Sequence, residues 1–200
     1  MSQILSLQKW QIVKLSSISI ATIFALVLLI QGINENSFRI LVRFTARSSC
    51  ILFLLAFVAS ALQKFKPSKV SNWLLRNRRY LGLSMAISHG FHAVAIAGVA
   101  ILTSENMVQD NFDASLGYVF ILLMTITSFP RLAALLGKRG WKILHTLGMY
   151  YLWLSFTVAF STRIGESWLF YTPWTAALFS ALILRLITLL KTRNSARELG

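Results

Sequence analysis

The sequence predicts an all-α integral membrane protein, a bundle of six transmembrane helices with both termini on the cytoplasmic side. Its 200 residues are 56% hydrophobic and only 13% charged, whereas soluble domains are about 25% charged. The mean hydropathy of +0.65 agrees with this. The apolar residues also gather into six runs of about the 20 residues that cross a bilayer as a helix.

In order, the predicted spans cover residues 15–33, 46–62, 80–103, 115–136, 141–161 and 168–190. The first apolar run is longer than a signal-peptide core, and no small-residue cleavage pattern follows it, so we expect a retained helix. Pro130 lies near the end of the fourth span and is expected to kink it or end it early. Pro173 lies in the first turns of the sixth span, where proline is better tolerated. Residues 1–200 are therefore predicted to form a single membrane domain.

Three arginines, Arg39, Arg43 and Arg47, lie before and at the start of the second span with a spacing of four residues, and so share one helical face. The simpler interpretation is an interfacial turn whose arginines meet lipid headgroups. The alternative is a contact with a haem propionate or an anionic partner. In the third span, Gly82, Gly90 and Gly98 are typical of close helix packing.

The basic residues predict the orientation. With both termini cytoplasmic, 16 of the 20 Lys and Arg residues lie on the inside, and only Arg39, Arg43, Arg47 and Arg163 lie outside. The net charge of +14 is thus explained by cytoplasmic loops, and nucleic-acid binding is not expected.

The sequence lacks the residues that several classes of function require. No Asp or Glu lies within a predicted span, which disfavours proton-coupled pumps and most ion-coupled carriers. Hydrolase triads, nucleotide-binding glycine loops and His-Glu-x-x-His helices are missing as well. The single cysteine, Cys50, excludes a disulfide framework, covalent haem attachment and iron–sulfur ligation.

All three histidines lie in two predicted spans: His89 and His92 in the third, His145 in the fifth. An ionisable residue inside a membrane helix is by default a functional candidate, and imidazole is the ligand type for b-type haem. The structural alternative is a hydrogen bond to a neighbouring helix. At about 1.5 Å per residue, His145 lies roughly 6 Å inside its helix, and His89 and His92 roughly 14 and 18 Å inside theirs. Because two ligands of one haem should lie at similar depths, these values favour pairing His145 with His89.

Short motifs occur in a particular order: RYLGL from Arg79 followed by His92, then Thr127-Ser128, then LGKR from Leu136 and WKILH ending at His145. Together they resemble the ferric reductase-like transmembrane domain family over residues 47–190. Within this family, the chain is similar to the membrane haem subunit of the bacterial methionine sulfoxide reductase system and, more distantly, to the membrane domain of NADPH oxidases and ferric reductases. The resemblance implies one b-type haem between the third and fifth spans, with His92 and His145 as iron ligands and His89 as a substitute.

One position departs from the family pattern. The family commonly has a second histidine thirteen residues after the first on the fifth span, where this chain has Val158. Since valine cannot ligate iron, the departure favours the rival class, a haem-free membrane scaffold or assembly protein that keeps the fold.

By this resemblance, the chain is expected to be an oxidoreductase subunit that carries electrons through a bacterial inner membrane. The donor would be a quinol or a separate reductase, because we expect no flavin or NAD(P)H domain in the chain itself and flavin only through a partner. The acceptor would be a partner protein or a metal ion.

Overall fold

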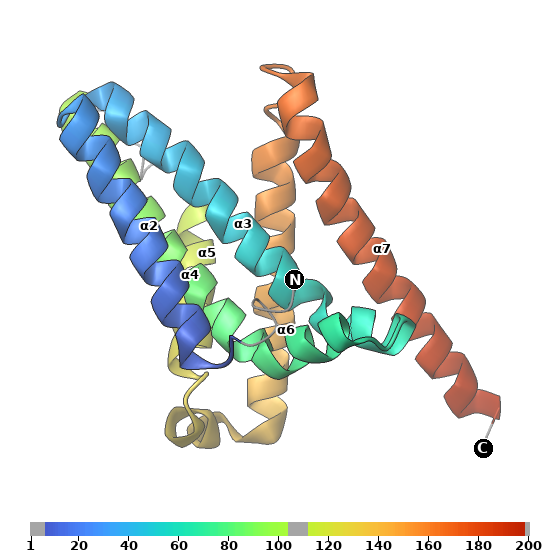
Figure 1. The fold of residues 1–200 in the computed structure, drawn as a ribbon. Coiled ribbons are helices and arrows are strands. Elements are labelled where there is room, and N and C mark those ends of the chain that lie inside the picture. Colours follow the sequence, from blue (N-terminus) through green and yellow to red (C-terminus); the bar gives the residue numbers. More distant parts are fainter. Residues whose placement is uncertain (1–6, 104–111, 199–200) are drawn as a thin grey trace.

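The computed structural model of the chain describes residues 7–103 and 112–198, and this part contains six α-helices and no strand (Figure 1). The all-α prediction is confirmed. The helices are α2 (Trp10–Gln31), α3 (Glu35–Phe65), α4 (Lys69–Thr103), α5 (Phe112–Ile126), α6 (Pro130–Ser161) and α7 (Trp168–Glu198). Five of these are long and apolar enough to cross a membrane, whereas the apolar part of α5, Ser115–Ile126, is shorter. A helical membrane bundle fits these lengths.

Helix α3 begins eleven residues earlier than the predicted second span. The side chain of Asn34 caps it by accepting a hydrogen bond from the backbone N–H of Ser37, at 3.0 Å. The three spaced arginines, predicted to lie in an interfacial turn, therefore belong to the first turns of a continuous helix. Arg39 forms an ion pair with Glu35 there, with 2.6 Å between Nε and Oε1.

Helix α5 ends at Ile126, ten residues before the predicted end of the fourth span. Residues 127–129 turn, and Pro130 takes the first position of α6, where its missing N–H is not needed. The helical geometry breaks again at Gly137, whose φ of 64° is left-handed. We call residues 130–139 the elbow. In Figure 1 it is seen nearly end-on at the lower end of the upright α6.

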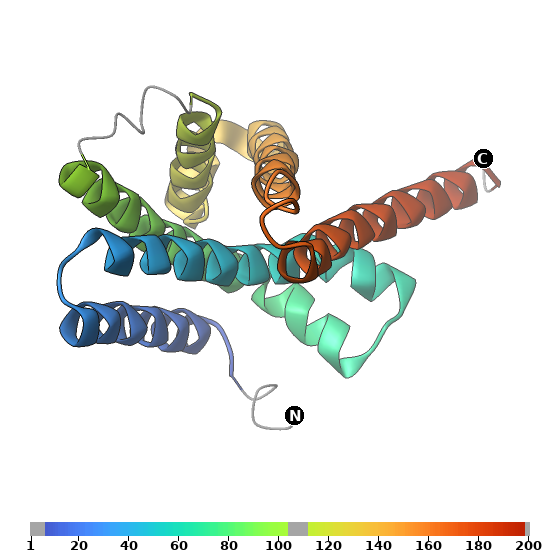
Figure 2. The ribbon, with the colours of Figure 1, turned by 90° about the horizontal axis from the view of Figure 1, so that it is seen from above.

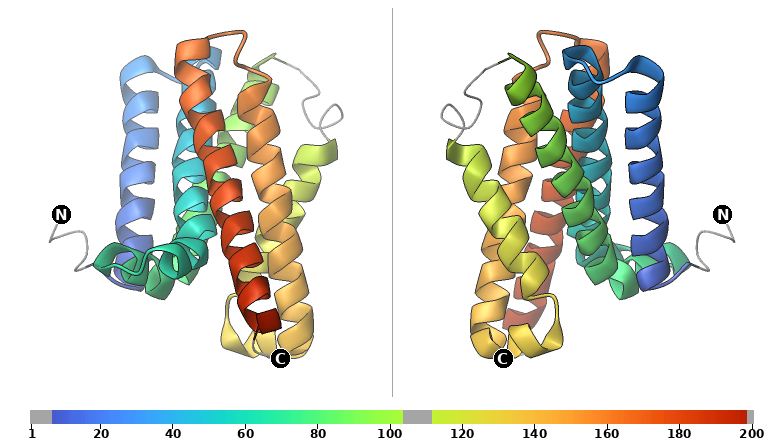
Figure 3. Two further views of the ribbon diagram at one scale, coloured as in Figure 1. Left: turned by 90° about the vertical axis from the view of Figure 1, so that its right-hand side faces the viewer. Right: turned by 90° about the vertical axis from the view of Figure 1, so that its left-hand side faces the viewer.

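The helices alternate in direction, so that α2 begins and α7 ends at the same end of the bundle (Figures 1 and 3). The most extensive packing is between α3 and α4, with α2 against α4 and α7 against α3. On the other side α5 packs against α6, and α6 against α7. Seen from above, α5 and α6 stand apart from the α3–α4 pair (Figure 2).

Two glycines allow close helix contacts. A Cβ at Gly98 would overlap the ring of Phe38, and a Cβ at Gly148 would overlap the sulfur of Met124. At Gly82 and Gly90, in contrast, a Cβ would meet no atom within 4 Å. Reading these two glycines as packing positions was wrong, because their side of α4 faces open space.

Candidate cofactor site between α4 and α6

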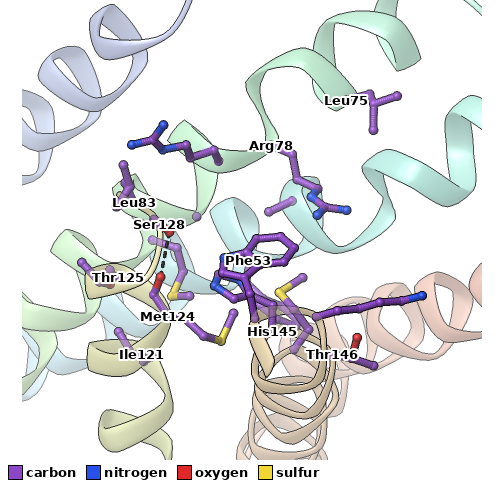
Figure 4. Close-up of a pocket in the computed structure, with 18 of the residues that line it drawn as sticks. Phe53, Leu75, Arg78, Leu83, Ile121, Met124, Thr125, Ser128, His145 and Thr146 are labelled. Atoms are coloured by element: carbon purple, nitrogen blue, oxygen red, sulfur yellow. Dashed lines mark hydrogen bonds between the residues drawn. The ribbon is translucent and has the colours of Figure 1, made fainter. Parts of the chain in front are cut away.

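A cavity of about 630 Å³ lies between α4 and α6, bordered also by α3, α5 and α7 (Figure 4). Five cationic side chains line it, and no carboxylate does: Arg76, Arg78, Arg79, Lys142 and Arg185. We call it the basic cavity. In Figure 4, His145 lies beside Phe53, with Met124 and Ile121 to one side and Arg78 to another. The space thus combines an apolar interior with a strongly positive wall.

His145 is held in one orientation by two neighbours. Its Nε2 lies 3.1 Å from the hydroxyl oxygen of Thr127, and its ring stacks on Trp141 at 4.2 Å between centroids. The Thr127 hydroxyl already donates its hydrogen to the carbonyl of Leu123, at 2.6 Å. Nε2 must therefore carry the proton and donate, which leaves the lone pair of the imidazole on Nδ1.

Trp141 completes this arrangement. Its indole N–H donates to the carbonyl of Thr127 at 3.0 Å, so the turn after α5 is tied to α6 through both the backbone and the hydroxyl of one threonine. The ring of His145 is fixed before any ligand binds, and such preorganisation lowers the cost of binding.

The positive wall includes a residue contributed by α7. The guanidinium of Arg185 donates to the carbonyl of Phe57 at 3.2 Å, and its Cζ lies 4.3 Å from the Phe57 ring centroid and 5.0 Å from that of Tyr150. Arg79 lies over the ring of Phe129 at 5.5 Å, and its buried Nε has no hydrogen-bond partner among the described residues. Buried unpaired donors of this kind are costly, so an anion in the cavity would be stabilised.

A second, smaller cavity of about 180 Å³ lies farther along the same two helices. His89 and His92 line it together with Tyr118 and Arg163, and we call it the two-histidine cavity. The His89 ring lies 5.0 Å from that of His92 and 4.9 Å from that of Tyr118. In the described part of the chain, His89 Nδ1 and the Tyr118 hydroxyl are both buried without partners.

His92 has the opposite tautomer from His145. Its Nδ1 lies 3.1 Å from the carbonyl of Val42 and 3.0 Å from the hydroxyl of Thr45. A carbonyl can only accept, so Nδ1 carries the proton and the lone pair is on Nε2. Metal-ligating histidines usually donate their other ring N–H to a group such as a backbone carbonyl, which fixes the orientation of the ring.

The structure brings His89 and His92 together but places His145 in the other cavity. Of the two cavities that the histidines line, the basic cavity has a volume within the range of about 300–1,000 Å³ that holds small molecules and cofactors, and the two-histidine cavity is smaller. Val158 lines neither cavity, and 51% of its surface is exposed. Its side chain neither fills the place of a cofactor nor points toward one.

The sequence interpretation missed two sets of residues. Arg185 lies within the predicted sixth span, and a charge inside an apolar span is itself a signal of function. The positive-inside pattern explains it only as a cytoplasmic charge. Three methionines, Met85, Met124 and Met149, meet in the basic cavity from three different helices. Nothing in their spacing along the chain indicates that they meet.

No protein family, no curated protein and no solved structure matches this chain. Within the described residues, no cluster of three or more His, Cys, Asp or Glu side chains suited to a bare metal ion is present either. The two cavities and the motif residues around them are therefore the features of the molecule that bear on its function.

Proposed function

We propose that this protein transfers electrons across a membrane through a b-type haem held in the basic cavity between α4 and α6. The observation that carries the proposal is the composition of that cavity. It has a cofactor-sized volume, one imidazole with a free lone pair, and five cations without a carboxylate. A haem would bring an iron that accepts nitrogen ligands and carries one electron at a time, together with two propionates.

The residues of the cavity divide between the two ends of such a ligand. His145 supplies the nitrogen ligand on the α6 side, held by Thr127 and Trp141. The guanidinium groups of Arg78, Arg79 and Arg185 are suited to carboxylates, because charge-assisted hydrogen bonds to arginine are strong and directional. Phe53 and Ile121 supply an apolar part of the wall.

Three residues of α4 are candidates for a second side chain that would hold the iron. His92 is the one that the family resemblance implies, and its free Nε2 supports this, although it lines the neighbouring cavity. Met85 lines the basic cavity itself, and a thioether paired with histidine is an established form of haem ligation. His89 is a third candidate because its Nδ1 lacks a partner.

The proposal includes the membrane arrangement. Six spans, with α5 as the short one, would place both termini and the basic cavity on the cytoplasmic side of a bacterial inner membrane. The positive-inside rule supports this orientation. A quinol or a separate reductase would supply electrons, and a partner protein or metal ion would receive them.

The visible spectrum of the detergent-purified protein, oxidised and dithionite-reduced, tests the proposal. We expect a Soret band with sharp reduced α and β bands, lost in His145→Ala and in one of His92→Ala, Met85→Ala or His89→Ala. If expression with added haem precursor yields no Soret band, the redox proposal fails. A haem-free membrane scaffold whose histidines hold helices together would then be the function.

A further inference from the structure

The elbow, residues 130–139, has an amphipathic surface that no other part of the described chain covers. Its leucines are exposed, Leu135 at 81% and Leu132 and Leu136 at lesser fractions. Its cations, Arg131, Lys138 and Arg139, are exposed as well. An apolar face next to a cluster of cations is the pattern of segments that lie in the interface of a membrane.

The elbow cations differ from the arginines at the opposite end of the bundle. Arg39 is paired with Glu35, and Arg47 lies over the ring of Phe170 at 4.2 Å. Arg131, Lys138 and Arg139 have no hydrogen bond, ion pair or ring contact with any described residue, although each is placed on a defined backbone. Their charges are therefore available to a group outside the protein.

No acid in the neighbouring sequence offsets these charges. Between residues 114 and 165 the chain has no Asp or Glu. The elbow also lies at the end of the bundle where α2 begins and α7 ends (Figure 3). Most of the Lys and Arg residues are near that end, which makes an anionic surface the complementary partner.

The elbow is anchored where it joins the bundle. Phe129, which precedes it, stacks on Trp10 at 6.4 Å between centroids and carries Arg79 over its ring. At its other side the left-handed Gly137 turns the chain into the part of α6 that bears Trp141, Lys142 and His145. The leucines and cations of the elbow are thus held outward on a fixed base.

We propose that the elbow binds the phosphate headgroups of anionic phospholipids, with Arg131, Lys138 and Arg139 at the headgroups and Leu135 inserted among the acyl chains. The proposal rests on the membrane location in the proposed function but not on haem. A lipid surface is favoured over an acidic protein because the exposed leucines need an apolar partner beside the cations.

Thermal unfolding in lipid nanodiscs tests this, with phosphatidylcholine alone or mixed with phosphatidylglycerol. The elbow variant is R131Q/K138Q/R139Q, and the matched control is R39Q/R43Q/R47Q, which removes the same charge from the opposite end. We expect phosphatidylglycerol to raise the unfolding midpoint of the wild type and of the control. In the elbow variant, the increase in midpoint caused by phosphatidylglycerol should be smaller by at least about half. The same reduction is expected for the wild type at ~1 M salt, because the Debye length is then about 3 Å. Equal midpoints in phosphatidylcholine verify that the variant folds.

A fluorophore on Leu135→Cys, in a Cys50→Ser background, gives a second readout. We expect phosphatidylglycerol to protect it from a water-soluble quencher. An unchanged lipid-dependent rise in the elbow variant, or a label quenched equally in both lipids, would overturn the proposal and leave an acidic protein as the partner. Haem content is read from the Soret band of the same samples, so either proposal can fail without the other.

Discussion

The basic cavity and the two-histidine cavity lie along the same two helices, yet different kinds of side chain line them. The first gathers five cations, three thioethers and a single imidazole. The second gathers two imidazoles and two phenol rings, with one arginine. The comparison shows that a histidine in an apolar helix has no fixed role, because its neighbours from other helices decide its tautomer, its partners and what can reach it.

The two tautomers make this concrete. His145 donates from Nε2 to a hydroxyl on the turn after α5, whereas His92 donates from Nδ1 to the carbonyl of Val42 on α3. Each histidine therefore keeps its lone pair on the other nitrogen. Substitutions at four places test this difference between the cavities, and His145→Ala has the largest expected effect.

Substitution of His145 should abolish haem binding, whereas a substitution that leaves the basic cavity intact should not. We expect the Soret absorbance per mole of protein to fall at least about tenfold in His145→Ala, because the proposed haem would lose one of the side chains that hold its iron. The measurement is the haem-to-protein ratio after purification. Retention of the full Soret band in His145→Ala would move the haem out of the basic cavity.

The hydroxyl groups that contact His145 and His92 should contribute differently to the free energy of unfolding. Thr127→Val removes the one hydrogen-bond acceptor that the described structure gives to His145 Nε2, so we expect a loss of about 1–3 kcal/mol in the free energy of unfolding. Thr45→Val leaves the Val42 carbonyl to His92, so we expect a loss below about 1 kcal/mol. Denaturation in detergent compares the two variants. Equal losses would contradict the tautomers assigned here.

The packing of α5 on α6 beside the basic cavity should be destabilised by a larger side chain at Gly148. A Cβ at Gly148 would overlap the Met124 sulfur and lie 3.2 Å from Cδ1 of Phe120. Because the thioether can rotate away, we expect Gly148→Ala to cost only about 1 kcal/mol in the free energy of unfolding. Gly90→Ala is the control, since its Cβ would meet nothing and alanine is the better helix former by up to about 1 kcal/mol. A lower unfolding midpoint for Gly90→Ala than for Gly148→Ala would be inconsistent with the packing described.

The smallest effect is expected at Val158, where the chain departs from the family pattern. Val158→His restores the histidine that the resemblance implies, but the side chain would point away from both cavities. We expect an unchanged haem-to-protein ratio and an unchanged reduced spectrum. A second haem in this variant would show that α6 turns its other face to a cofactor.

The sequence predicted the helical class, and it selected the two helices that border both cavities. Periodicity and hydropathy were enough for this, since they report which runs of residues can be buried or face lipid. The end of α5 at Ile126 was harder to place. The apolar run continues through Leu136, and Pro130 signals a break without showing whether a helix ends or restarts there.

The composition of the candidate site depends on contacts between distant segments. Arg185 and Phe57 meet across more than a hundred residues, and Thr127 reaches His145 through a turn whose geometry hydropathy does not encode. The prediction that His92 and His145 share one haem remains a prediction. The sequence gives depth along a helix, but it does not report which side of the helix faces which cavity.

The three methionines around the basic cavity give it properties that aliphatic side chains would not. Thioethers rotate about three bonds and are polarisable, so Met85, Met124 and Met149 can reshape the wall around ligands of different outline. Oxidation of a thioether gives a sulfoxide, which is polar and chiral where the thioether is apolar and flexible. Oxidation of these methionines would therefore make the wall of the basic cavity more polar, whereas no sulfur atom lines the two-histidine cavity.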